Sequence, residues 1–435
     1  GAYHWHNGVF NQVHSSPSVH RDMFPGVITY SQRLREAGYR QGYVGKWHAS
    51  FLRMPLDFGY DEIAAPLAYN PRLLRGVDYN PDRVPKPRRG ALRRHVDRWF
   101  SWPGSDPFPM WGYLEGPEEE SRPYWVAENG IRMMQRLAAS GRPWHLEVQF
   151  VVPHDAYMPL KQYLDRYDPA KIPVPESFYD TFAGKPGLHK RESETWGKVT
   201  EDDYRQGRAH YYAYCEQVDA QIGRVLDALD RTGQAQNTLV TFCADHGDMV
   251  GDHRMWIKGW IPYEECYRVP MVMRWPARIK AGLVSPRLVH VHDFAYTYID
   301  AAGAAPLGYE EGRSLLPLAE NPQRQDWPEH ILCAYYGGEY LYTQRIAITE
   351  RYKYVFNGFD FDELYDLHTD PEEMHNRVAD PSYAAVADDM RARIYELMAQ
   401  LGDPYGDPSP NFNMPDSEPP GRYCAPRYLP RGKRM

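Results

Sequence analysis

Polar side chains follow three apolar runs of this sequence, at the points where the runs end. Lys46 and His48 follow the first run, His154 follows the second, and Asp245 with His246 follows the third. Lysine neutralises the oxygens of a sulfuryl or phosphoryl group, and histidine moves protons near neutral pH. An Asp-His pair can hold a divalent cation. These residue types together predict a site for a tetrahedral anion beside a metal.

A second lysine, Lys258, follows the Asp-His pair and would add positive charge for the same anion. Simpler explanations exist for single residues, since Asp245 could cap a helix and Lys46 could be an ordinary solvated lysine. No such explanation accounts for polar groups at three strand ends at once. Asp248 and His253 are interpreted instead as residues that structure the loop.

The elements that must position these groups alternate between helices and strands. Strands are predicted over residues 41–44, 145–152, 237–244 and 270–274, and helices over 29–37, 124–139 and 211–229. Alternating helices and apolar strands predict a parallel sheet covered on both faces, with functional groups at its carboxyl edge. We therefore predict an α/β fold with a mainly parallel central sheet flanked by helices.

The helix over 211–229 has the clearest periodicity, with steps of three and four between apolar residues. Its stripe consists of Tyr211, Cys215, Val218, Ile222, Val225 and Leu229. We interpret this stripe as core rather than as a cofactor site. Gly223, beside the stripe, would allow the helix to approach the sheet closely.

A polar, proline-containing stretch at 320–329 indicates a linker between two parts of the chain. Beyond it, strands are predicted over 330–336, 344–349 and 352–356, and a helix over 383–401. We predict a catalytic α/β domain at residues 1–325. Residues 326–435 would form a smaller α+β subdomain with a short antiparallel sheet and an irregular, proline-rich tail.

Composition limits the classes of partner. The chain has 435 residues, a net charge of −8 and a pI near 6.1, which argues against a general nucleic-acid binder. No stretch approaches the ~20 apolar residues of a transmembrane helix. The five cysteines lack metal or redox spacing, so the cytoplasm and the periplasm or exterior both stay open as locations. The composition does not predict an oligomeric state.

Several segments together resemble the sulfatase family of the alkaline phosphatase superfamily, in particular its arylsulfatase-like, formylglycine-dependent members. They are EAGYRQGYVGKWH (36–48), VVPHDAYMP (151–159), YYAYCEQVDAQIGRVLDALDRTG (211–233), NTLVTFCADHGDMVGDH (237–253), YEECYRVPMVMRWP (263–276), GRSLLPL (312–318) and ELYDLHTDPEEMHN (363–376). They occur in the family's order and cover almost the whole chain, so the set is far more specific than any single motif.

The resemblance implies a role for each matching residue. Lys46 and Lys258 would bind the sulfate group of the substrate. His48 would assist the nucleophile and its regeneration. His154 would contact the sulfate and donate a proton to the leaving group.

The resemblance also implies that Asp245 and His246 are metal ligands. Calcium prefers oxygen ligands, which suits Asp245, whereas the imidazole of His246 widens the choice towards manganese or another divalent ion. We expect Ca²⁺ first and Mn²⁺ second.

Two parts of the family pattern are missing from the sequence. One is the pair of aspartates at the end of the first strand, which supplies two more metal ligands. The other is the C/S-x-P-S/A-R signature, whose Cys or Ser becomes formylglycine. Ser15-Ser16-Pro17-Ser18 lacks the arginine, and Cys424-Ala425-Pro426-Arg427 has it one place early. We expect the nucleophile upstream of Gly1, so that residues 1–435 alone would be inactive.

The favoured function is hydrolysis of a small anionic sulfate ester, either an aryl or a carbohydrate sulfate. A phosphonate or phosphate mono- or diester hydrolase of the same superfamily is the alternative, because Asp245-His246 and the nearby Lys258 suit both. The GKWH segment favours the sulfatase. From a different class, the chain could be an inactive fragment or binding protein that exposes apolar sheet surface.

Overall fold

A computed structural model provides the structure, and it describes residues 2–9, 22–68, 70–75, 79–101, 106–258, 261–337, 342–358 and 360–403. The two rejected nucleophile candidates, 15–18 and 424–427, lie outside these residues, as does the tail beyond 403. Within the described part, no helix combines the length and the apolar character needed to cross a membrane.

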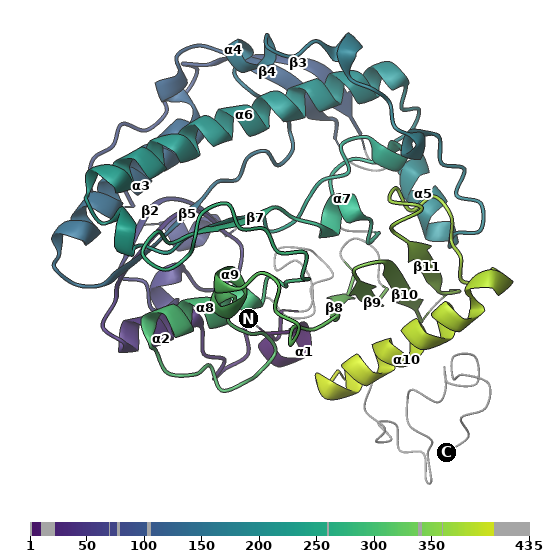
Figure 1. Ribbon diagram of the computed structural model, residues 1–435. Helices are drawn as coiled ribbons and strands as arrows, with labels where there is room; N and C mark the ends of the chain where they lie inside the picture. Colours follow the sequence, from purple (N-terminus) through teal and green to yellow (C-terminus); the bar gives the residue numbers. More distant parts are fainter. Residues whose placement is uncertain are drawn as a thin grey trace.

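The strands under helices α3 (Arg122–Ala139) and α6 (Glu201–Arg231) form a three-stranded parallel sheet in the order β2-β1-β5 (Figure 1). Its strands are β1 (Arg40–Trp47), β2 (Glu62–Ala68) and β5 (Trp144–Gln149). Helices α3 and α6 lie together over this part of the molecule (Figure 1). Val44, Val126 and Met133 belong to the core cluster between α3 and the sheet. The predicted parallel α/β arrangement is therefore confirmed.

The predicted strands near 240 and 270 form a separate antiparallel pair, β6 (Val240–Cys243) and β7 (Met271–Arg274). β5 and β6 contribute to one apolar cluster under α3 and α6, yet the described residues show no ladder between them. Phe242 and Val272 are 42% and 59% exposed. These strands are thus only partly buried, because burial of a strand depends on neighbours that its own sequence does not specify.

The opposite side carries α2 (Tyr30–Glu36) and α8 (Asp293–Ala302). The rings of Tyr30 and Tyr298 lie 5.2 Å apart, and Thr241 of β6 is hydrogen-bonded to Tyr298 at 2.7 Å. The other strands and α-helices that precede β8 are the hairpin of β3 (Arg93–Phe100) and β4 (Phe108–Glu115) and several short helices. Those helices are α1 (His4–Asn7), α4 (Lys161–Leu164), α5 (Gly187–Thr195), α7 (Glu264–Tyr267) and α9 (Leu316–Glu320).

Helix α6 begins earlier than the apolar stripe predicted, and its most buried face differs from that stripe. Gln217 and Gln221 are each 1% exposed. Gln217 accepts from the backbone N–H of Leu160 at 2.9 Å, and Gln221 donates to Glu118 at 2.7 Å. The prediction for Gly223 was wrong, because it is exposed and a Cβ there would meet nothing.

The C-terminal part is a four-stranded antiparallel sheet in the order β11-β10-β9-β8, as expected for a short antiparallel sheet. Its elements are β8 (His330–Tyr335), β9 (Gln344–Thr349), β10 (Tyr352–Asn357), β11 (Glu363–Asp366) and α10 (Ala384–Gln400). Helix α10 packs on this sheet through Met390 and Ile394 (Figure 1). The domain boundary near 325 stays a prediction.

Candidate active site

Lys46 lies at the carboxyl end of β1, where the pairing with β2 shifts between Val44 and Lys46. Gly45 makes this irregularity possible, since it has a φ of +100° and a Cβ would overlap the backbone oxygen of Gln149. The Tyr43 hydroxyl donates to the carbonyl of Lys46. The backbone around Lys46 is therefore fixed by its neighbours, and the side chain extends from a rigid strand end.

Asp245, His246 and Lys258 are brought together by one loop that leaves β6 and returns. The outgoing backbone is bonded to the returning one, from Met249 N–H to the Ile257 carbonyl at 2.8 Å and from Gly251 N–H to the Met255 carbonyl at 2.7 Å. These bonds place Lys258 beside the start of the loop, although Lys258 lies well beyond that start in the sequence.

Asp245 and His246 point into the same space as Lys46. Lys46 Nζ lies 3.3 Å from Asp245 Oδ2, and His246 Nε2 lies 3.8 Å from the same oxygen. Burial alone would raise the pKa of Asp245, but the charges of His246 and Lys46 hold this pKa below its usual value. Burial lowers the pKa of His246, which favours the neutral imidazole that binds metals.

This pair fits part of a divalent-metal site. An oxygen and a nitrogen 3.8 Å apart can share one ion at the ordinary ligand distances of about 2.0–2.6 Å. Among the described residues, no group of three or more His, Cys, Asp or Glu side chains could hold an ion. Asp245 and His246 therefore supply two ligands of a set that these residues do not complete.

His154 follows β5 and contacts Lys258 rather than Lys46. Its Nε2 atom lies 2.5 Å from Lys258 Nζ, and its Nδ1 atom lies 2.8 Å from Asp155 Oδ1. The imidazole rings of His154 and His246 lie 5.9 Å apart. Burial lowers the pKa of Lys258. Residues from β1, β5 and the loop after β6 thus meet at one place.

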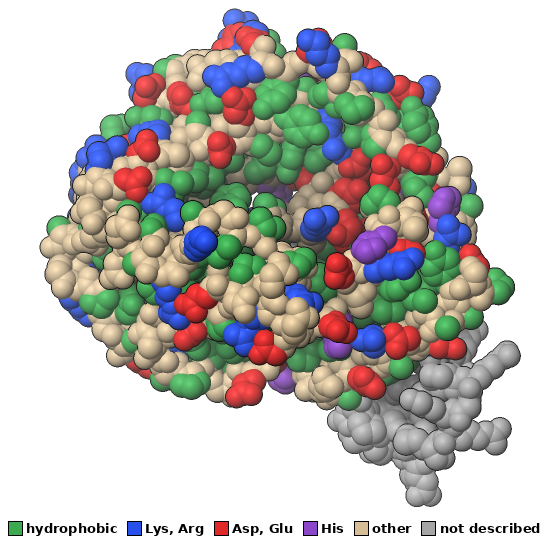
Figure 2. Space-filling view, in the orientation of Figure 1, with side chains coloured by type: hydrophobic (Ala, Val, Ile, Leu, Met, Phe, Trp, Pro, Cys, Tyr) green, Lys and Arg blue, Asp and Glu red, His purple; other side chains and the backbone are tan. Residues whose placement is uncertain are grey.

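A cavity of about 2050 Å³ opens at this place, and Figure 2 shows the molecule hollowed near the centre of its face. Five of the six predicted site residues line the cavity, namely Lys46, His48, Asp245, His246 and Lys258. His154 is not among its lining residues, but it contacts Lys258, which lines the cavity. The cavity holds both positive charge and the Asp-His pair, as a site for an anion beside a metal requires.

The loop between His246 and Lys258 is fixed by buried polar contacts of Asp248 and His253, as expected for these residues. Asp248 accepts from the Tyr157 hydroxyl at 2.7 Å, and burial raises its pKa to about 6. His253 is fully buried, with Nδ1 2.8 Å from Asp180 and its ring stacked on Tyr263 at 3.9 Å. These contacts fix the conformation of the segment between His246 and Lys258.

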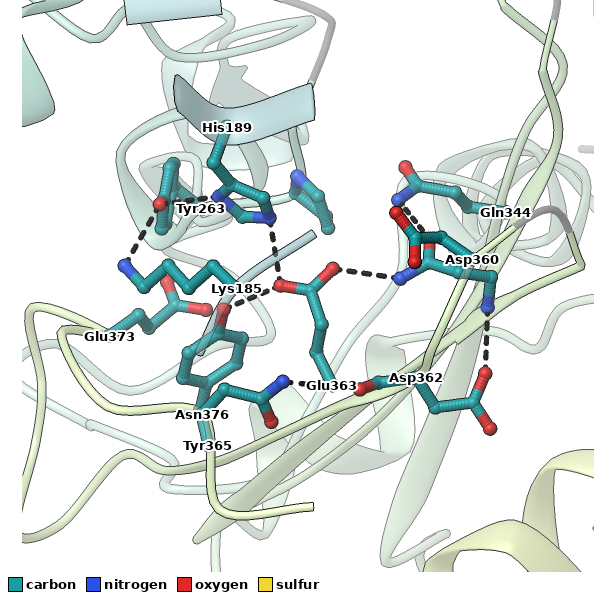
Figure 3. Close-up of polar contacts among 12 residues, drawn as sticks. Lys185, His189, Tyr263, Gln344, Asp360, Asp362, Glu363, Tyr365, Glu373 and Asn376 are labelled. Carbon is teal, nitrogen blue, oxygen red and sulfur yellow. Dashed lines mark hydrogen bonds and ion pairs between the residues drawn. The ribbon is translucent and has the colours of Figure 1, made fainter. Parts of the chain in front are cut away.

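Tyr263 continues this network towards the C-terminal sheet (Figure 3). Its hydroxyl lies 2.6 Å from His189 Nδ1 and 3.0 Å from Lys185 Nζ. His189 in turn lies 2.8 Å from Glu363 of β11. His189 and Glu363 were not predicted from the sequence, because nothing local distinguishes them from other polar residues.

Comparison with known proteins identifies the family of this chain. A family model described as sulfatase matches residues 29–304, and one described as N-sulphoglucosamine sulphohydrolase, C-terminal, matches residues 251–400. The chain belongs to the sulfatase family. Members of this family generally use a divalent metal and a formylglycine.

Curated relatives share this family. A sulfatase of Escherichia coli K12, YidJ, is 26% identical over 92% of this chain and 78% of that protein. The choline-sulfatase of Rhizobium meliloti is 28% identical over 86% of this chain and 72% of that protein. An arylsulfatase of Clostridium perfringens is 30% identical over 68% of this chain and 61% of that protein.

Solved structures show the same fold. A protein in complex with its substrate D-glucosamine-2-N,6-O-disulfate superposes with a TM-score of 0.70 at 22% identity, over 92% of this chain and 86% of that chain. The phosphonate monoester hydrolase of Agrobacterium radiobacter superposes with a TM-score of 0.69 at 22% identity, over 92% of this chain and 84% of that chain. These similarities establish an alkaline phosphatase-like fold, but they do not identify the substrate.

Proposed function

We propose that this protein hydrolyses sulfate esters, with Lys46 and Lys258 binding the sulfate group and Asp245 and His246 binding a divalent metal. The observation that carries the proposal is the meeting of these four side chains at one cavity, from two different strand ends. The family membership and the sulfatase relatives support the same activity.

The two lysines act on the charge of the reacting group. In sulfuryl transfer, negative charge lies on the sulfuryl oxygens and grows on the leaving oxygen. Lys46 Nζ and Lys258 Nζ are cations fixed by neighbouring groups, so they stabilise this charge without a large rearrangement. His48, which also lines the cavity, is assigned to proton transfer at the nucleophile. His154 is assigned to the leaving group through Lys258, whose ammonium group it contacts.

A metal bound by Asp245 and His246 would act as a Lewis acid on an oxygen of the sulfate. Carboxylate oxygen favours calcium and imidazole broadens the range, so we propose Ca²⁺ first and Mn²⁺ second. The nucleophile is proposed to be a formylglycine, because members of this family generally use one.

The alternative is a phosphonate monoester hydrolase, favoured by one solved structure of similar fold. The two activities are separated by measuring kcat/KM of the complete, metal-loaded enzyme on 4-nitrophenyl sulfate and on 4-nitrophenyl phenylphosphonate. We expect the sulfate to be the better substrate. A preference for the phosphonate would contradict the proposal.

Lys258→Ala tests the site itself. We expect this variant to lower kcat/KM for the aryl sulfate by about 100-fold or more, because loss of a fixed charge next to the transition state costs roughly 3 kcal/mol. Lys280→Ala is the control, because Lys280 lines the same cavity but has no assigned role. Turnover near the wild-type value in Lys258→Ala would remove Lys258 from the mechanism.

A further inference from the structure

Asp155 lies next to His154 and has no role in the site as described above. Its Oδ1 atom lies 2.8 Å from His154 Nδ1, and its side chain is 18% exposed. Its backbone carbonyl lies 3.1 Å from the same nitrogen. The hydrogen bond from Nδ1 goes to this carbonyl, and the carboxylate adds a charge contact beside it. Both oxygens lack protons, so the proton of a neutral His154 lies on Nδ1.

The other ring nitrogen of His154 contacts Lys258. Nε2 lies 2.5 Å from Lys258 Nζ, and an ammonium group can only donate. Nε2 must therefore accept from Lys258, which requires that the ring proton stay on Nδ1. The opposite tautomer would place an N–H against the ammonium and remove this hydrogen bond. The three side chains thus form a directed chain from Asp155 through His154 to Lys258.

We propose that Asp155 is a positioning residue of this site, which holds the His154 imidazole protonated on Nδ1 and thereby fixes the direction of the Lys258 ammonium in the cavity. The functional part rests on the proposed function, because that function gives Lys258 its role. The arrangement of the three side chains does not depend on it.

The charge of Asp155 suits this role. Burial alone would raise its pKa, but the hydrogen bond from His154 and the charges of His154 and Lys258 hold the pKa below its usual value. Asp155 is then an ionised acceptor near neutral pH, and a hydrogen bond to a charged group is roughly twice as strong as a neutral one. A lysine side chain has many rotamers, so a fixed acceptor for Nζ restricts it considerably.

The first experiment measures the tautomer directly. In protein labelled with ¹⁵N-histidine, the ring nitrogens of His154 should show a proton on Nδ1, with the resonance assigned by its loss in His154→Gln. In Asp155→Ala, which keeps the backbone carbonyl, we expect both tautomers to be populated. A proton on Nε2 in the wild type, or an unchanged tautomer in Asp155→Ala, would overturn the proposal.

The second experiment asks whether Asp155 acts through Lys258. We expect Asp155→Ala to lower kcat for an aryl sulfate by about 10-fold or more, as loss of a supporting hydrogen-bond partner does in other sites, and Asp155→Asn to lower it less. In the Lys258→Ala background, Asp155→Ala should change kcat by less than about 2-fold, because residues that act as a unit are not additive. An equal loss in both backgrounds would show a merely structural role.

Asp97→Asn is the matched control. Asp97 also contacts a histidine, with Oδ2 3.1 Å from His210 Nε2, but neither residue lines the cavity. This variant should keep wild-type kcat. If the wild-type enzyme hydrolyses phosphonates instead, the same series is measured on the phosphonate. If it hydrolyses neither, the proposed function fails while the ¹⁵N measurement still decides the role of Asp155.

Discussion

At the scale of single residues, Gly45 determines where Lys46 can lie. Its φ of +100° is strained for any other residue, and a Cβ would overlap the Gln149 carbonyl of the adjacent strand. We expect Gly45→Ala to separate β1 from β5 at this point and to lower kcat/KM for an aryl sulfate by about 10-fold or more, since small displacements at a site are costly.

Gly38→Ala is the matched control, because Gly38 has a φ of +91° but a Cβ there would meet nothing. It should cost about 1 kcal/mol of unfolding free energy through backbone strain alone, with unchanged turnover. Denaturant unfolding and initial rates measure the two effects. Equal results for the two variants would contradict the assigned role of Gly45.

The types of the site residues could be predicted from the sequence, but not all of their contacts. Lys46, Asp245, His246 and Lys258 follow predicted strands or lie in a recognisable motif, and the structure brings them to one cavity. The contact between Asp155 and the neighbouring His154 was not predicted, since it depends on the conformation of the turn. Residue order alone does not specify that conformation.

At the scale of elements, periodicity predicted the helices and many strands, but it did not predict which strands pair. The hairpin of β3 and β4 was missed, because β3 is rich in charged residues and largely exposed. β7 was predicted as a strand but pairs antiparallel to β6. Pairing depends on contacts between distant segments, whereas periodicity reports only which side of an element is apolar.

Glu265 of helix α7 is expected to make the stability of the protein depend on pH. Glu265 Oε2 is buried and has no hydrogen-bond partner among the described residues, and burial raises the pKa of Glu265 to about 8. The folded protein therefore holds a proton that the unfolded chain releases near pH 4.5, so this group lowers stability as pH rises from about 4.5 to 8.

Glu265→Gln removes this proton and keeps the shape of the side chain. We expect the Tm of the variant to exceed that of the wild type at pH 8, and the difference to shrink towards pH 5. Glu350→Gln, at the turn between β9 and β10, serves as the control and should show no such trend. A pH-independent difference for Glu265→Gln would mean that Glu265 is ionised in the folded state.

At the scale of the whole molecule, Lys353 connects the C-terminal sheet to the part that carries the site. This residue of β10 is fully buried, with Nζ 2.7 Å from Glu264, 2.9 Å from Glu373 and 2.8 Å from the Pro262 carbonyl. Glu264 begins α7, whose Cys266 carbonyl accepts from the Gly247 N–H at 2.9 Å, directly after His246. The C-terminal sheet thus reaches the metal-ligand segment through α7.

Lys353→Met should therefore affect both stability and the site. Removing one partner of a buried ion pair typically costs about 3–5 kcal/mol, because the remaining carboxylates stay buried without their cation. We expect a loss of this size in urea unfolding, together with weaker metal binding by calorimetry at a temperature where the variant is folded. Arg393→Met is the control, since Arg393 pairs with Asp389 on the exposed face of α10 and should cost less than about 1 kcal/mol. Stability loss without weaker metal binding would show that Lys353 attaches the C-terminal sheet but does not position Asp245 and His246.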